Sequence, residues 1–138
     1  MATDTTTLTT ADADRLISAA HHAAGEQGVT ISASVLDAGG HLLALRRDDR
    51  ALLIAGETST RKAYTALQLG TSTADLVDAV QPGGPFHTLP TALDRPLLFI
   101  AGGVPIHRNG RLVGALGIGG GTPAQDHAFA TTALAELV

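Results

Sequence analysis

Two apolar segments joined by Asn109-Gly110 constrain the fold more than any other feature of this sequence. Asn-Gly suits the two-residue type I′ turn of a β-hairpin, because both turn positions require a positive φ. The second arm, Leu112 to Ile118, is apolar on both faces, as expected of a central strand. The sequence therefore predicts an antiparallel hairpin whose second arm lies inside a sheet.

An earlier part of the chain predicts a second hairpin. Ile31, Ala33 and Val35 alternate with polar residues, which is the period of a half-buried strand. The turn "DAGGH" at 37–41 leads into "HLLALR", which is expected to be the paired strand. By composition, "LLFIA" at 97–101 predicts a further strand.

Helical spacing of apolar and small residues predicts three longer helices, and the second carries a face of small residues that suits close packing on a sheet. A shorter helix, capped by Ser72, is expected to run through Val80, followed by an irregular segment over 85–96. The element order predicts an α+β domain around an antiparallel sheet. The first of the three longer helices is expected to have Thr10 as its N-cap and Gly28 as its C-terminal stop. The second is expected to run from Leu52 to Leu69 and to be ended by Gly70, and the third from Thr122 to about Leu137.

The chain of 138 residues is long enough for one domain, which we place at 10–138 behind a frayed polar tail at 1–9. Apolar residues make up 44% of it but aromatic ones only 3%, so the core is expected to be aliphatic and rich in alanine. A formal charge of −4 argues against nucleic acid or an anionic membrane as the partner. The absence of cysteine excludes disulfides, thiolate metal sites and cysteine nucleophiles. We expect a cytoplasmic protein with no signal peptide and no membrane span.

The glycine-rich stretch "LGIGGGTPAQD" at 116–126 raises the question of a phosphate-binding loop. Its glycines are spaced as GxGxG, which is not the dinucleotide fingerprint, and no lysine followed by serine or threonine completes a P-loop. The segment from Thr122 to Gln125 instead matches a capping box at a helix N-terminus. The stretch is therefore interpreted as a strand-to-helix junction, at which Gly119, Gly120, Gly121 and Thr122 stay candidates for binding a small anionic group.

Three segments, in this order, together resemble one known family: "VLDAGGHLLALRRDD" (35–49), "STRKAYTALQLG" (59–70) and "GGVPIHRNGRLVGALGIGGGTPAQD" (102–126). The family is the GlcG/HbpS family, which also includes the C-terminal domain of PduO-type proteins. The resemblance covers nearly the whole chain. It implies a profilin-like fold, with an antiparallel sheet flanked by helices, and assembly into homo-oligomers. It also implies a small-molecule ligand, with haem as the cofactor of some members and haem degradation in one branch.

Haem iron needs an axial ligand such as histidine, and the chain has six histidines. At 100° per residue on the first predicted helix, His21 falls about 90° from the centre of the apolar face and His22 roughly opposite it. His21 is thus expected to be half-buried and is the candidate haem ligand, whereas His22 is expected to face water. The alternative is that both are ordinary surface histidines.

Three further residues are candidates for acid/base chemistry. His87 lies in a proline-bounded loop, and an imidazole acts as acid or base near neutral pH. Lys62, in the segment that resembles the family's "KAYTA", is either a desolvated base or anion anchor or a packed interface lysine. Glu57 pairs with Arg61 at i,i+4, which by itself predicts a surface ion pair. Tyr64, beside the small-residue face, is a candidate ligand contact.

No HxH, HExxH or two-histidine-one-carboxylate spacing predicts a metal site. Three hypotheses for the function stay open. The chain is a small-ligand-binding protein that binds haem at a subunit interface, a cofactor-independent enzyme of small-molecule metabolism that uses acid/base chemistry, or an accessory protein that stabilises a partner enzyme. The residues alone do not decide whether the protein is an enzyme.

Overall fold

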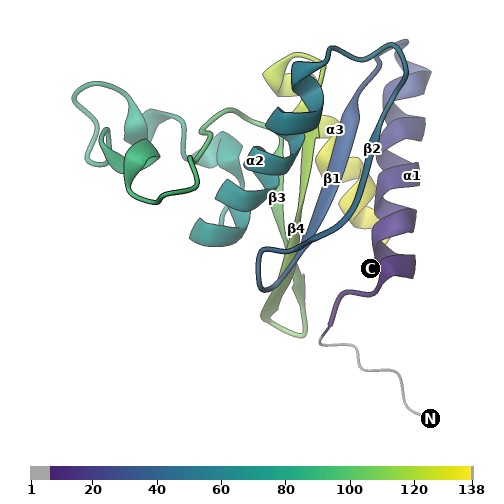
Figure 1. The fold of residues 1–138 in the computed structure, drawn as a ribbon, viewed down its shortest axis with the longest axis horizontal. Helices are drawn as coiled ribbons and strands as arrows, with labels where there is room; N and C mark the ends of the chain where they lie inside the picture. The colour runs from purple at the N-terminus through teal and green to yellow at the C-terminus, as the bar shows by residue number, and fades with distance from the viewer. Residues whose placement is uncertain (1–6, 138) are drawn as a thin grey trace.

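Within residues 7–137, the part of the chain that the computed structural model describes, four antiparallel strands form one sheet with helices on both faces (Figure 1). Helix α1 (Thr10–Glu26) and helix α3 (Pro123–Ala135) pack together on one face, and α2 (Ile54–Leu69) covers the other. The predicted α+β class around an antiparallel sheet is confirmed. The strands, in the spatial order β2-β1-β4-β3, are β1 (Ser32–Asp37), β2 (Leu42–Arg47), β3 (Gly103–Arg108) and β4 (Arg111–Gly119).

Both predicted hairpins are present, β1 with β2 and β3 with β4. Asn109 and Gly110 form the second turn with φ values of 51° and 77°, as a type I′ turn requires. β4 lies between β1 and β3, so its prediction as a central strand is confirmed. The predicted capping box of α3 is also confirmed: Gln125 N donates to Thr122 Oγ1 at 3.2 Å, and Thr122 N donates to Gln125 Oε1 at 3.0 Å.

Two predicted helix starts were wrong by one or two residues. The N-cap of α1 is Thr9 and not Thr10, because Asp12, three residues after Thr9, completes a capping box with it. Helix α2 begins at Ile54 and not at Leu52. Residues 1–6 of the predicted tail lie outside the described residues, and Leu8, near its end, is buried in the core.

Two further elements predicted between α2 and β3 were wrong. Instead of a helix through Val80, the chain forms two 3₁₀ turns, Thr73–Asp75 and Asp78–Val80. The hydroxyl of Thr73 donates to Ile100 O (2.8 Å) and accepts from Gly103 N (3.0 Å), which ties this segment to the start of β3. The segment 97–101 is not a strand, because Leu98 N donates to Thr65 Oγ1 (2.8 Å) and not to a neighbouring strand.

The core has two parts, one on each face of the sheet, and is largely aliphatic as predicted. Leu116 and Ile118 of β4 face α1 and α3, where Phe129 is the one buried phenylalanine among the described residues. Ala115 of β4 faces α2 on the other side. The α1–α3 side therefore holds the larger side chains and the α2 side the smaller ones.

Helix α2 lies directly on the sheet backbone. A Cβ atom on Gly117 would overlap the carbonyl oxygen of Ser59, and one on Gly103 would overlap the carbonyl oxygen of Lys62. Glycine at these two strand positions lets the helix backbone approach without intervening side chains. The predicted small-residue face of α2 is confirmed, and its counterpart is a set of glycines on β3 and β4.

Replacing Gly117 by alanine tests this contact. The added methyl group has no room against Ser59 and Ala63, so Gly117→Ala is expected to destabilise the fold by about 3 kcal/mol. Gly25→Ala is the matched control, because a Cβ there meets nothing within 4 Å and the position is helical; it is expected to stabilise by about 0.5–1 kcal/mol. Urea unfolding followed by circular dichroism measures both. Equal effects of the two variants would contradict the direct helix–sheet contact.

Candidate functional site

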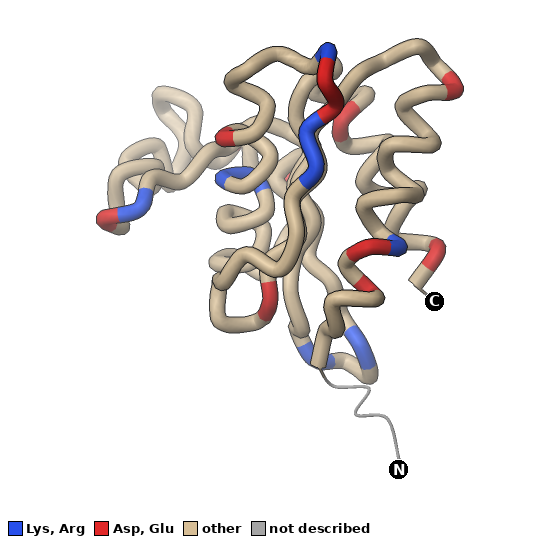
Figure 2. Tube along the Cα trace, turned by 45° about the vertical axis from the view of Figure 1, so that its right-hand side comes forward, with Lys and Arg blue, Asp and Glu red and all other residues tan. Residues whose placement is uncertain are grey.

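The half-buried histidine of α1 lies in an open groove at one end of the sheet. The groove, which we call the His21 groove, has a volume of about 620 Å³. In Figure 2 the residues 46–50 that border it form a run of basic and acidic positions at the top of the view. The groove is lined by His21, Gly25, Gly28, Val29, Thr30, Arg46, Arg47, Asp48, Asp49 and Arg50.

His21 is held in one orientation by β2. Its Nε2 lies 2.8 Å from the carbonyl oxygen of Arg46. Because a carbonyl only accepts, Nε2 carries the proton and Nδ1 keeps the free lone pair. Burial lowers the pKa of His21, and the nearby Arg46 charge lowers it further, while the hydrogen bond to Arg46 O and the Asp48 charge raise it. The net lowering keeps the ring neutral at pH 7, and a neutral imidazole with one nitrogen fixed by a carbonyl is the usual state of a metal-ligating histidine.

His22 differs from its neighbour in every respect that matters for ligation. Its side chain is 79% exposed, and its Nε2 lies 2.8 Å from Glu26 Oε1. The predicted contrast between a half-buried His21 and an exposed His22 is confirmed. The two residues therefore form a matched pair on one helix for experiments.

Lys62 is buried in an ion pair. Its Nζ donates to Asp126 Oδ2 (3.0 Å) and to Ile118 O (2.9 Å), and Lys62 and Asp126 are only 4% and 1% exposed. Burial raises the pKa of Asp126, an effect that the Lys62 ammonium and the N–H of Gly121 oppose. The pair links α2 on one face of the sheet to α3 on the other.

The glycine junction is closed by its own side chains. Gly121 N donates to Asp126 Oδ1 at 2.9 Å, so this amide already has an anionic partner. A Cβ on Gly119 would press on Thr58, and one on Gly120 would press on the backbone at Thr30. Among the candidates for binding an anionic group, these three glycines thus serve packing and the junction, and Thr122 serves as the helix cap.

The acid/base candidates are not gathered into one site. His87 is exposed on the segment between α2 and β3. Glu57 is exposed and accepts from Arg61 Nε at 3.1 Å, the surface pair that its spacing predicts. No hydrogen bond or ion pair among residues 7–137 joins His87, Glu57 and Lys62. Tyr64 is 9% exposed, and the Arg95 guanidinium lies 4.2 Å from its ring centroid.

The remaining histidines offer no second ligand site in the described part of the chain. His41 is exposed with its Nδ1 3.3 Å from Asp37 Oδ1, and His107 is exposed on β3. His127 differs, because its Nδ1 is buried with no hydrogen-bond partner among the described residues. Across residues 7–137, no group of three or more His, Asp or Glu side chains is placed to hold a metal ion.

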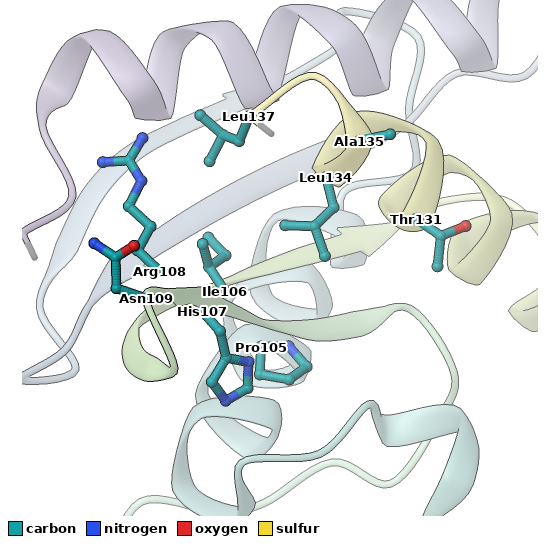
Figure 3. Close-up of a pocket in the computed structure, with 9 residues that line it drawn as sticks. All are labelled: Pro105, Ile106, His107, Arg108, Asn109, Thr131, Leu134, Ala135 and Leu137. Carbon is teal, nitrogen blue, oxygen red and sulfur yellow. The ribbon is translucent and has the colours of Figure 1, made fainter. Parts of the chain in front are cut away.

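A larger hollow of about 700 Å³ lies between β3 and the end of α3 (Figure 3). Figure 3 shows Ile106, Leu134 and Leu137 pointing into it, while His107 points away. Arg108 also lines the hollow, and its guanidinium donates to Asp12 Oδ2 at 2.9 Å and to Thr7 O at 3.1 Å. The walls of this hollow thus combine aliphatic and polar side chains, and the ring of its one lining histidine, His107, is turned away from it.

Sequence reasoning missed two sets of residues. Asp126 was not linked to Lys62, because 64 residues separate them and the pairing depends on two helices meeting around the end of the sheet. Arg46 and Arg50 were not singled out, although strand alternation places Arg46 on the same face as Ala44, toward α1. That alternation was the available signal for a basic residue near His21.

A family model described as "Haem degrading protein HbpS-like" matches residues 8–135. An uncharacterised 15.0 kDa protein of the dhaT-dhaS intergenic region of Citrobacter freundii is 38% identical over 128 residues, which are 93% of this chain and 90% of that protein. Corrinoid adenosyltransferase PduO of Salmonella typhimurium is 36% identical over 126 residues. The matched part is 91% of this chain but only 38% of PduO.

A solved structure has a closely similar fold. The crystal structure of a PduOC–haem complex superimposes with a TM-score of 0.89 at 36% sequence identity, and the match covers 94% of both chains.

None of the helices described in residues 7–137 is long and apolar enough to cross a membrane.

Removing one partner of the buried ion pair tests its structural role. Asp126→Asn leaves the Lys62 ammonium buried without an anion and is expected to destabilise the fold by about 3–5 kcal/mol. Adding Lys62→Met is expected to recover part of that loss, because no buried charge then remains. Glu57→Gln, which breaks the exposed pair with Arg61, is the control and is expected to cost about 0–1 kcal/mol. Thermal unfolding measures all three, and a double variant that is less stable than Asp126→Asn alone would contradict a coupled pair.

Proposed function

The chain belongs to the HbpS-like family, and from that premise we propose that it is a small-ligand-binding protein that binds haem through His21. The observation that carries the proposal is the fixed, half-buried imidazole whose Nδ1 keeps a free lone pair in the His21 groove. Bound haem supplies an iron that takes an axial nitrogen ligand. His21 would provide that ligand, with the Arg46 carbonyl holding the ring in place.

The residues that line the His21 groove fit haem in part. The neutral ring supports ligation, and the groove volume suits a ligand of small-molecule size. Its lining is mostly polar, with Val29 as the largest aliphatic side chain, so one copy of the groove covers little of a flat apolar ring. The haem complex of PduOC supports the choice of ligand by similarity.

The acid/base hypothesis has less support. Such catalysis needs a base within hydrogen-bond reach of a bound substrate, usually in a cleft. His87 and Glu57 are exposed, and Lys62 is already paired. The accessory-protein hypothesis has no particular residue in its favour.

Replacing each of the two adjacent histidines by alanine, one at a time, tests the proposal. Adding ferric haem to the wild-type protein is expected to shift the Soret absorption band, and His21→Ala is expected to abolish the shift and weaken binding by about tenfold or more. His22→Ala, at the exposed neighbour, is expected to leave both unchanged. A wild-type protein without a spectral change, or a His21→Ala variant that keeps it, would exclude His21 as the ligand.

We further propose that the protein assembles with copies of itself and that the interface adjoins the His21 groove. Large aliphatic side chains are exposed along β2 and on the connection into α2, including Leu53, which is 84% exposed. Exposed apolar groups in such number mark an association surface. The connection between β2 and α2, which carries Leu52 and Leu53, is held to the groove, because Arg47 Nη1 donates to Ala51 O at 3.0 Å. We name this set the β2–α2 aliphatic face: Leu42, Leu45, Leu52, Leu53 and Ile54.

Sedimentation experiments test the interface. The wild-type protein is expected to sediment at a multiple of the 14.0 kDa chain mass, and Leu53→Asp to sediment as a monomer, because a charge cannot be buried there without cost. Leu93→Asp, at a 41% exposed leucine outside this face, is the control and should not change the assembly. If the haem site lies at the interface, Leu53→Asp also weakens haem binding. A monomeric wild-type protein would refute the interface.

A further inference from the structure

We propose that the guanidinium groups of Arg46 and Arg50 bind carboxylates of the ligand in the His21 groove, so that the groove selects a tetrapyrrole with free carboxylates over the same ring without them. The inference rests on the proposed function, because it concerns the same groove. It adds the specificity of the site, which iron ligation by His21 alone does not supply.

Most positively charged side chains of the protein already have a bonding partner. The chain has nine Lys and Arg residues, all within the described part, and six of them are engaged by carboxylates, backbone carbonyls or the Tyr64 ring. Among the described residues, the three side chains without such a partner are those of Arg46, Arg50 and Arg111. Two of these three line the His21 groove. Unpaired guanidinium groups that border one cavity with an available histidine point to an anionic ligand.

The strand register places Arg46 beside His21. Arg46 pairs with Ala33, whose side chain lies in the core on the α1 face of the sheet. The Arg46 side chain therefore emerges on the α1 face, where His21 bonds to its carbonyl oxygen. Arg47, the next residue, is used differently, since its Nη1 donates to Ala51 O on the way into α2.

Arg50 lies on a turn that is held rigid. Arg50 N donates to Asp48 Oδ1 (2.9 Å), Ala51 N donates to Asp48 O (3.0 Å), and Asp48 N donates to Ile31 O (2.9 Å). The Asp48 carboxylate is thus engaged by a backbone amide, and no bond is formed with the Arg50 guanidinium. This arrangement leaves the Arg50 side chain available while fixing the backbone that carries it.

Two acidic residues oppose anion binding and limit its strength. Asp48 and Asp49 line the groove together with Arg46, Arg47 and Arg50, so positive side chains exceed negative ones by one. A weak net field of this kind does not attract anions in general. It favours a ligand whose carboxylates reach the guanidinium groups directly, where charge-assisted and bidentate hydrogen bonds form.

Iron-free protoporphyrin IX and its dimethyl ester test the inference, because they share one ring and differ in their carboxylates. Titrations followed by porphyrin fluorescence are expected to show tighter binding of the free acid by wild-type protein. Arg46→Gln combined with Arg50→Gln is expected to weaken binding of the acid by about tenfold and to leave the ester unchanged. Added salt is expected to reduce the difference between the two ligands.

Arg111→Gln is the control for these titrations, and Asp49→Asn is a further test. Arg111→Gln removes the third unpaired guanidinium, at the hairpin end of β4, and is expected to change neither titration. Asp49→Asn removes an opposing charge and is expected to tighten binding of the acid. Equal wild-type affinity for acid and ester, no effect of the double substitution, or no porphyrin binding would overturn the inference. If protoporphyrin binds as expected but ferric haem gives no His21-dependent spectrum, the iron-ligation proposal fails and the carboxylate site stands.

Discussion

The contact between the backbone of α2 and the glycines of β4 is the constraint on which the rest of the structure depends. With no side chain at Gly117, the helix lies on the strand itself, and polar groups between the two layers must be satisfied there. Ser34 and Ser59 do this with a hydrogen bond of 2.8 Å between their hydroxyls. Lys62 lies in the same layer, and its ammonium group donates to the Asp126 carboxylate near the end of the sheet.

This arrangement separates structural chemistry from ligand chemistry. The glycine junction, which at first suggests a phosphate site, is filled by the Asp126 carboxylate and the Thr122 cap. The groups available to a ligand, His21 Nδ1 and the Arg46 guanidinium, lie instead at the edge formed by α1 and β2. There His21 Nε2 bonds to the backbone carbonyl of Arg46. Because α2 is fixed on the sheet, the connection from β2 into α2 carries exposed leucines next to this edge. The proposed ligand site and the proposed interface thus follow from the placement of one helix.

Much of the fold could be predicted from local patterns. The Asn109-Gly110 turn, the Thr122 capping box and the small-residue face of α2 are short-range signals, and the structure confirms each. Two elements between α2 and β3, the helix through Val80 and the strand at 97–101, were predicted wrongly. Thr65 and Thr73 hold these stretches by side-chain hydrogen bonds over about thirty residues of separation, which override the local propensity.

The candidate site was predictable only in part. Helical spacing was enough to separate His21 from His22, since burial on an amphipathic helix is periodic. The Lys62–Asp126 pair and the approach of Arg46 to His21 depend on tertiary packing that no spacing in the sequence shows.

In the proposed function, His21 is the residue that ligates the iron of the bound haem. A crystal structure of the protein with bound haem tests this most directly. We predict that His21 Nδ1 lies at bonding distance from the iron, with Nε2 still on the Arg46 carbonyl and the haem carboxylates directed toward Arg46 and Arg50. Iron ligated by another residue, such as His22 or His87, or haem bound in the hollow between β3 and α3, would contradict it.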